Sequence, residues 1–339
     1  MENNELTVLG IDIAKKKFDI CLLKDNKERK KVFDNDIDGF EQLSRWLKSH
    51  DIEKAHACIE ATGRYYEALA NYLCEQGFFV SIVNPTKIKG FAQSELKRLK
   101  TDKIDAGIIA RFCRTHRPPN WKPLPAELRE LQEAERYLSS LKSMRVQESN
   151  RLESGLTSPK LIALIEANIA YFNQQIKDLE KWIKEHIKSH EKMRNHHKLI
   201  TSIIGIGDVT AAIYLGEIGY VERFNSTRQV ESFAGLMVRQ HTSGSSVHGK
   251  SRMSKVGNSH LRMAFYMPAL SAMQNNPVIR VFAERLKQKG KAGKVIVGAV
   301  MRKLLRLIHG VLRSGRPFDI SYQPALNSQP KAQPALVES

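Results

Sequence analysis

The sequence predicts three regions: an α/β domain with a mixed sheet, a connector of long helices, and a mainly helical C-terminal domain. Short apolar, β-branched segments alternate with helical segments before the prolines at 118–125. A polar stretch with regularly spaced leucines follows those prolines. The last region concentrates positive charge, and a length of 339 residues allows two domains plus a connector.

The N-terminal region, residues 1–120, is expected to contain five strands and three helices. Apolar and β-branched residues predict the strands, at 6–13, 18–23, 32–33, 55–59 and 78–83. Apolar residues at helical spacing predict the helices, at 40–47, at 65–74 and from Thr101 to Phe112. Strands followed by alternating helix and strand are typical of an α/β domain with a mixed sheet.

Residues 121–194 form the predicted connector. Their leucines are spaced by three or seven, first at Leu128, Leu131, Leu138 and Leu141. Ser158-Pro159 interrupts this pattern, so we expect two long helices that pair as a coiled-coil hairpin. A helical bundle subdomain is the alternative.

Residues 195–318 predict a mainly helical domain. From Val278 to Leu312, apolar residues alternate with lysines and arginines, which indicates helices with one core face and one phosphate-binding face. The tail, residues 319–339, is rich in Pro, Gln and Ser and is expected to be disordered.

The net charge is +18. Sixteen Lys and Arg residues and one acidic residue, Glu284, lie between Leu236 and Arg316, so this basic region carries a net charge of +15. Phosphate contacts release counterions, which favours a polyanionic partner. A solvated face or an anionic membrane surface is the alternative, but no amphipathic helix with aromatic anchors accompanies the charge. Nucleic acid is therefore the expected partner.

The four cysteines, Cys21, Cys58, Cys74 and Cys113, show no C-x-x-C spacing and lie in apolar or helical segments. We interpret them as buried free thiols. No run approaches the roughly 18 apolar residues that span a bilayer, and the acidic start lacks the basic residues of a signal peptide. We therefore expect a cytoplasmic protein, associated with the bacterial nucleoid when active.

Four acidic residues lie where an RNase H-like fold would bring them together. Asp12 lies in the first strand between two apolar neighbours, whose burial turns it to the opposite face. Glu60 ends a strand before a small turn, and Asp102 and Asp105 lie three apart on one side of a helix. Carboxylates at such places predict a site for Mg²⁺ (or Mn²⁺), and two ions support phosphodiester chemistry. Taken singly, each acid is also typical of a turn or a helix N-terminus.

The segment Ile203-Ile204-Gly205-Ile206-Gly207 lies between two helical stretches and resembles a helix-hairpin-helix turn. Gly205 and Gly207 would let backbone N–H groups approach a phosphate. A helix C-cap explains such a short pattern equally well.

A loop of small residues, Thr242 to Ser246, is followed by Lys250, Arg252 and Lys255. These cations, together with Arg262, are candidates for binding nucleic-acid phosphates. A serine in the loop is a candidate nucleophile, although serine needs a base, a metal or a cationic setting to react. Seen alone, a Gly/Ser loop is typical of a flexible linker.

Several short motifs then occur in a specific order over residues 6–318. They are Gly10-Ile11-Asp12, Ile59 to Tyr65, Asn84-Pro85, Lys100 to Ala106, Gly205-Ile206-Gly207, Phe233 to Leu236, and Ser243 to Ser246. In this order and spacing they resemble the DEDD-class insertion-sequence transposases, the bridge-RNA-guided recombinases related to the Piv DNA invertases.

The resemblance implies a RuvC-like N-terminal domain whose DEDD tetrad falls on Asp12, Glu60, Asp102 and Asp105. A coiled coil would join it to a transposase domain whose catalytic serine falls on Ser243. That serine would attack a DNA phosphate and form a covalent phosphoserine link. Thr242 stands where the family carries an acid, so no supporting role transfers to that position.

The resemblance also implies partners. A structured non-coding guide (bridge) RNA would pair with donor and target DNA and choose the sites. The chain would act as a homo-oligomer, a tetramer built from dimers, in which the tetrad of one subunit meets the serine of another.

Other function classes stay open. A RuvC-like nuclease or junction resolvase would activate water and leave no covalent intermediate, and a structural nucleic-acid-binding protein would use the acids only as helix caps. Sugar-kinase-like ATPases also begin with Gly-x-Asp, but the basic region fits them badly. Within the serine hypothesis, Ser245 and Ser246 are alternative nucleophiles.

Overall fold

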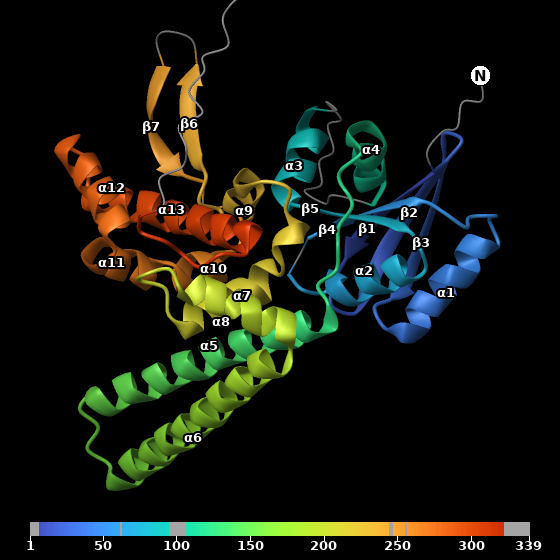
Figure 1. The fold of residues 1–339 in the computed structure, drawn as a ribbon. Coiled ribbons are helices and arrows are strands. Elements are labelled where there is room, and N and C mark those ends of the chain that lie inside the picture. The colour runs from blue at the N-terminus through green and yellow to red at the C-terminus, as the bar shows by residue number, and fades with distance from the viewer. Residues whose placement is uncertain (1–6, 62, 95–105, 244–246, 255, 322–339) are drawn as a thin grey trace, which may run out of the picture. The chain divides into compact units, whose positions relative to one another are not determined.

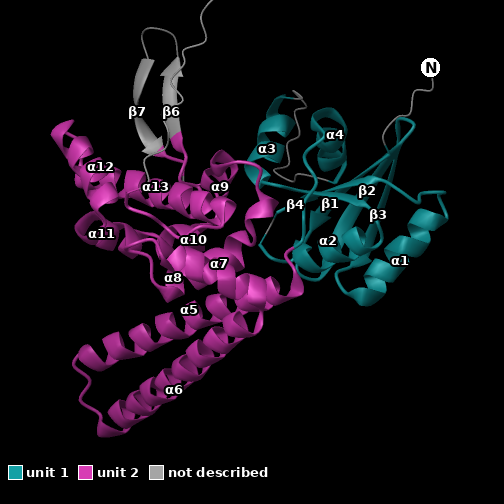
Figure 2. Cartoon of the chain, viewed as in Figure 1, with its two compact units in different colours: residues 1–123 teal, residues 124–339 magenta. Residues whose placement is uncertain are grey.

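The computed structural model describes residues 7–61, 63–94, 106–243, 247–254 and 256–321, with the backbone alone at 239–243 and 247–252. The chain forms two compact units, residues 1–123 and residues 124–339 (Figure 2). None of the described helices is both long enough and apolar enough to cross a membrane. Of the tail expected to be disordered, residues 319–339, the part from residue 322 onward lies outside the described residues.

Unit 1 is built on a mixed five-stranded sheet, as the sequence predicts (Figure 1). Its strands are β1 (Val8–Ile13), β2 (Lys17–Lys24), β3 (Lys27–Asp34), β4 (His56–Glu60) and β5 (Phe79–Val83). The order is β3-β2-β1-β4-β5, with β2 antiparallel to both β1 and β3, and β4 parallel to both β1 and β5. The central strand β1 therefore has an antiparallel neighbour on one side and a parallel neighbour on the other.

Helices cover both faces of this sheet, because alternate residues of each strand point to opposite sides. On one face, Leu9 and Ile11 share a core with α1 (Ile37–Lys48) and α2 (Tyr66–Glu75). On the other face, Val8 shares a core with α3 (Pro85–Ser94) and α4 (Ala106–His116). The expected helices are thus present, although Thr101, the predicted cap of α4, lies outside the described residues.

Helix α3 departs from the sequence prediction, in which Asn84-Pro85 only ends a strand. The same two residues begin a helix: the Thr86 backbone N–H donates to Asn84 Oδ1 at 2.8 Å. Proline is favourable in the first turn of a helix, where its missing N–H costs nothing. Asn84-Pro85 therefore both ends β5 and begins α3.

Unit 2 begins with the long helices α5 (Ala126–Glu153) and α6 (Pro159–Ser189), which form a helical hairpin (Figure 1). The predicted break at Ser158-Pro159 is confirmed. Leu128 and Leu131 of α5 and Ile183 of α6 belong to the same core as the later helices. That core is why the hairpin and the C-terminal helices form one compact unit.

The rest of unit 2 is helical except for one β-hairpin. Its elements are α7 (Glu191–Thr201), α8 (Asp208–Ile218), the 3-10 helix η1 (Val221–Arg223), α9 (Thr227–Phe233), β6 (Val238–Ser243), β7 (Val247–Met253), α10 (Ser259–Ala264), α11 (Tyr266–Asn275), α12 (Pro277–Gln288) and α13 (Gly293–Ser314). The sequence predicts no strands on either side of the small-residue loop at Thr242 to Ser246. Antiparallel pairing from Val238 with Met253 to Ser243 with Val247 shows that a β-hairpin flanks this loop, whose residues 244–246 lie outside the described residues.

Candidate active site and nucleic-acid interface

Asp12 and Glu60 lie side by side at the carboxyl ends of two neighbouring parallel strands. Ile11 of β1 pairs with Ile59 of β4, and the two acids follow one residue later on each strand. Neighbouring strands are about 4.8 Å apart. Both side chains belong to the face that α4 covers, because Gly10 and Cys58, two residues earlier, also point there. The sheet register thus brings together the first two predicted acids.

Glu60 is buried, and one of its two carboxylate oxygens lacks a hydrogen-bond partner in the described part of the chain. The residue is 7% exposed, and the oxygen without a partner is Oε2. Burial, together with the negative charge of Asp12, raises the pKa of Glu60 above its ordinary value. A carboxylate pair of this kind is stabilised by a bound cation, which offsets both the desolvation and the mutual repulsion.

Helix α4 begins against β1, the strand that carries Asp12. A side chain at Gly10 would lie 2.1 Å from the Ala106 carbonyl oxygen and 2.3 Å from the Ala110 nitrogen, so α4 lies directly on β1. Ala106 follows Asp105 in the sequence. Asp102 and Asp105 themselves lie outside the described residues.

No group of three or more His, Cys, Asp or Glu side chains arranged for a metal occurs in the described part of the chain, which leaves out half of the predicted tetrad. Sequence reasoning also overlooked a neighbouring acid, Asp19. It pairs directly with Asp12 across β1 and β2 and so lies on the same face. Its signal in the sequence is the apolar alternation of Phe18 and Ile20 around it.

Ser243 is the last residue of β6, and its backbone pairs with Val247 at the tip of the hairpin. Lys250 and Arg252 lie in β7, and Arg252 pairs with Arg239 along the backbone. Ser245, Ser246 and Lys255 lie outside the described residues. The predicted nucleophile and two of the predicted cations therefore belong to one β-hairpin.

The two glycines of the predicted helix-hairpin-helix turn have different environments. They lie between α7 and α8, as expected. Gly205 has a φ of +100°, and a side chain there would lie 2.7 Å from Ala272 of α11, so packing alone requires glycine. Gly207 is exposed, caps the N-terminus of α8 and has open space around it. Only Gly207 has the open surroundings that a phosphate would need.

Arg262 of α10 is held by backbone carbonyl groups. Its Nη1 donates to the carbonyl oxygens of Ala234 and Gly257, each at 3.2 Å. Nearby, the buried Glu217 of α8 accepts hydrogen bonds from Arg136, Asn258 and His260, at distances of 2.6–3.2 Å. This network was missed in the sequence, because its members come from distant segments and share no local spacing.

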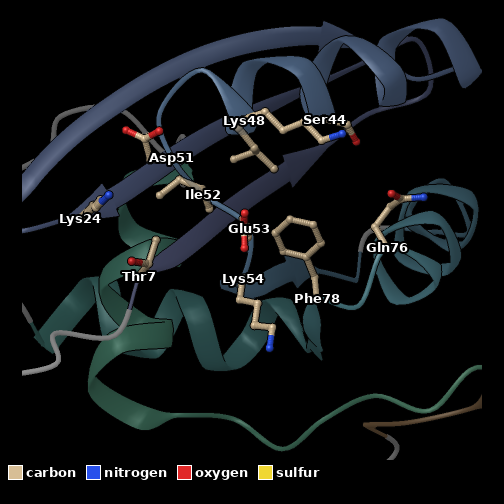
Figure 3. Close-up of a pocket in the computed structure, with 11 residues that line it drawn as sticks. Thr7, Lys24, Ser44, Lys48, Asp51, Ile52, Glu53, Lys54, Gln76 and Phe78 are labelled. Carbon is tan, nitrogen blue, oxygen red and sulfur yellow. The ribbon is translucent and has the colours of Figure 1, made fainter.

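A pocket at the opposite end of the unit 1 sheet is separate from the acids (Figure 3). Its lining includes Thr7, Lys24, Lys54 and Phe78, which lie at or next to the ends of β1, β2, β4 and β5 farthest from Asp12 and Glu60. The carboxylate pair is therefore not part of this pocket.

Two family models match the chain. One, described as Transposase, matches residues 9–159, and the other, described as Transposase IS116/IS110/IS902 family, matches residues 197–284. The first range contains the four predicted acids, and the second contains Ser243 and the predicted nucleic-acid-binding residues.

Three relatives align with this chain over nearly their whole length. The pilin gene-inverting proteins of Moraxella bovis and Moraxella lacunata are each 35% identical over 316 residues, which is 92% of this chain and 98% of the relative. The transposase for insertion sequence element IS1328 of Yersinia enterocolitica is 26% identical over 337 residues, covering 88% of this chain and 90% of the relative. Similarity across both units to proteins of these two kinds shows that the chain belongs to the IS110 family of transposases and recombinases, enzymes that cut and rejoin DNA.

Proposed function

We propose that this chain recombines DNA through a covalent phosphoserine intermediate on Ser243, assisted by divalent metal at an RNase H-like, RuvC-like acidic site. The observation that carries the proposal is the pairing of half-buried Asp12 with buried Glu60, in which one Glu60 oxygen lacks a partner among the described residues. Such a pair is an unfavourable arrangement in a protein without a bound cation.

The residues present fit a hard divalent cation. Asp12 and Glu60, with Asp102 and Asp105 completing the tetrad, would hold Mg²⁺ or Mn²⁺ through carboxylate oxygens. When bound, the ion polarises a phosphoryl oxygen and lowers the pKa of a coordinated hydroxyl.

Ser243 carries out the covalent step in this proposal. A bond forms between its Oγ and the DNA phosphorus while the bond from phosphorus to the leaving strand oxygen breaks. The serine proton ends on that leaving oxygen, which becomes a hydroxyl group. Attack by the hydroxyl of the exchanged strand reverses the step, rejoins the DNA and frees the serine.

The proposal includes partners and assembly. A structured bridge RNA selects donor and target DNA, and a tetramer brings the tetrad of one subunit to the serine of another. The family membership and the net charge of +15 between Leu236 and Arg316 support a nucleic-acid partner of this kind.

The test is covalent trapping on end-labelled DNA whose nick prevents religation, resolved on a denaturing gel. Wild-type protein should form an adduct, whereas Ser243→Ala should bind RNA and DNA normally and form none. Mixing Ser243→Ala with Glu60→Gln should restore some recombination, because each subunit supplies the half that the other lacks. An adduct retained by Ser243→Ala would move the nucleophile to Ser245 or Ser246.

A second candidate is a RuvC-like nuclease that activates water. The favouring observation is that Asp12 and Glu60 alone already form the beginning of such a site. Efficient cleavage by the wild-type protein without any adduct would establish this candidate and overturn the serine.

A further inference from the structure

The base of the β6–β7 hairpin is tied together by backbone hydrogen bonds. The Ser254 N–H donates to the Met237 carbonyl at 2.8 Å, and the Asn258 N–H donates to the Phe233 carbonyl at 2.8 Å. Residues before β6 are thus fixed to residues after β7. A two-stranded hairpin has little stability of its own, so its placement depends on such anchoring.

Two glycines allow the chains to approach each other closely at this base. Gly235 has a φ of +66° and Gly257 a φ of +141°, both unfavourable for other residues. A side chain on Gly257 would lie 2.5 Å from the Phe233 carbonyl oxygen and 2.6 Å from the Gly235 nitrogen. Both glycines are therefore needed for the backbones to meet.

Arg262 links the two segments of the hairpin base through its guanidinium group. Its two acceptors, the Ala234 and Gly257 carbonyls, lie on opposite sides of the hairpin in the sequence. A side chain on Gly235 would lie 2.5 Å from Arg262 Nη1, so the guanidinium fills the space that glycine leaves. We call residues 233–237, residues 253–254, residues 256–258 and Arg262 the hairpin clasp.

The clasp is anchored to the helices of unit 2 at two points. Asn258 caps α10 by accepting from the Leu261 N–H at 2.9 Å, and its amide donates to the buried Glu217 at 2.6 Å. Met253, the last residue of β7, packs against α13, where a side chain on Gly298 would lie 2.7 Å from its Cε. The hairpin base therefore has a fixed position in the unit 2 core.

We propose that Arg262 is a positioning residue for the strand transfer reaction: by closing the clasp it fixes the direction of the hairpin that carries Ser243. This inference rests on the proposed serine mechanism and deepens it. Its alternative is the phosphate-binding role that the sequence suggests for Arg262. The two roles differ in whether Arg262 acts on the rate at saturating DNA or on DNA affinity.

The experiment measures single-turnover adduct formation on nicked DNA as a function of DNA concentration, with the full-length protein and its RNA. Arg262→Ala should lower the rate constant at saturating DNA by about 10- to 100-fold, as expected for a displaced nucleophile. The DNA concentration giving half the maximal rate should stay unchanged. The salt dependence of DNA binding should also stay unchanged.

Matched variants separate this role from loss of stability. Arg194 makes the same kind of contact elsewhere in unit 2, with its Nη1 donating to the Lys188 carbonyl at 3.2 Å. Arg194→Ala should retain the wild-type rate even if its thermal midpoint falls as far as that of Arg262→Ala. Arg262→Lys should recover part of the rate, because an ammonium group can still bridge the two carbonyls. Gly235→Ala would place a side chain 2.5 Å from Arg262 Nη1 and 2.9 Å from the Val256 carbonyl oxygen, so it should open the clasp and reproduce the defect of Arg262→Ala.

The possible failures are distinct. If wild-type protein forms no adduct, the serine mechanism fails and the positioning role falls with it. If wild type forms the adduct and Arg262→Ala matches it in rate, the clasp inference alone is overturned. A salt slope reduced by about 0.9, as for one lost phosphate contact, would instead assign Arg262 to DNA binding. Replacing Lys250, Arg252 and Lys255 together provides the positive control for such a change.

Discussion

Glu60 in unit 1 and Glu217 in unit 2 are both almost fully buried, with exposed fractions of 7% and 2%. Their surroundings differ. Glu217 is held by a bidentate Arg136, whose two contacts measure 2.7 and 2.8 Å, and by Asn258 and His260 at the start of α10. Glu60 has Asp12 as its neighbour, and within the described part of the chain its Oε2 accepts no hydrogen bond.

The pKa values of the two carboxyl groups are consequently shifted in opposite directions. Burial by itself raises the pKa of Glu217, but hydrogen bonds from Arg136, His260 and Asn258 outweigh it and lower that pKa to about 2. For Glu60, burial and the charge of Asp12 both raise the pKa. A buried carboxylate whose partners are all protein groups is structural, whereas one left without a partner is available to a ligand.

The largest effect is expected from Glu60→Gln. The amide keeps the shape of the side chain but removes the charge that a divalent cation requires, so recombination should fall by at least about four orders of magnitude. Thermal stability and DNA binding should stay near the wild-type values. Recombination assays, thermal melts and binding titrations measure these three quantities.

A matched control for this variant is Glu41→Gln, which neutralises an exposed glutamate of α1 on the other face of the sheet. It should recombine normally. Wild-type recombination by Glu60→Gln would remove this residue from the metal site.

The next effect is a loss of stability in Glu217→Ala. Removing the carboxylate leaves Arg136 without its bidentate partner and the amide of Asn258 without its acceptor. The free energy of unfolding should fall by about 3–5 kcal/mol. Chemical denaturation at pH 7 measures this change, and an unchanged midpoint would contradict the structural role of the network.

The pH dependence sharpens this prediction. The pKa of Glu217 is about 2 in the folded protein, below its ordinary value of 4.5, so its stabilising contribution is complete above pH 4.5. That contribution is lost as the pH falls from 4.5 toward 2. The stability difference between wild type and Glu217→Ala should therefore narrow over that range.

The sequence predicts unit 1 well because its signals are local. Alternation along β1 places Asp12 on the opposite face from Ile11, and the end of an apolar run places Glu60 at the end of a strand. The parallel pairing of β1 with β4 then brings the two acids together. The β6–β7 hairpin escapes prediction because its strands are polar and basic, so neither shows an apolar alternation.

Contacts between distant segments account for the other misses. The sequence predicts that Gly205 binds phosphate, yet a side chain at this position would meet Ala272, 67 residues later. The Glu217 network joins Arg136 of α5 to Asn258 and His260 at the start of α10, more than 100 residues later in the sequence. Such side-chain meetings depend on how helices pack, which no local pattern specifies.

The smallest effect concerns a third buried glutamate, Glu135 of α5, which is 4% exposed. Burial, with a smaller contribution from Glu180, raises its pKa to about 7, against the opposing charges of Lys142 and His260. Because this folded pKa exceeds the ordinary value of 4.5, wild-type stability should fall as the pH rises from 4.5 to 7.

Replacing Glu135 by Gln removes the free-energy cost of ionising a buried carboxyl group, so this variant should be more stable than wild type at neutral and higher pH. We expect a gain of about 1–3 kcal/mol at pH 8 that shrinks toward zero near pH 4. Denaturation curves across this pH range measure the gain, and Glu153→Gln, at an exposed glutamate of the same helix, should show almost none. A variant less stable than wild type at pH 8 would mean that the charged carboxylate of Glu135 is held by a favourable partner, as Glu217 is. In that case, burial without partners would no longer distinguish Glu60 from the structural acids of unit 2.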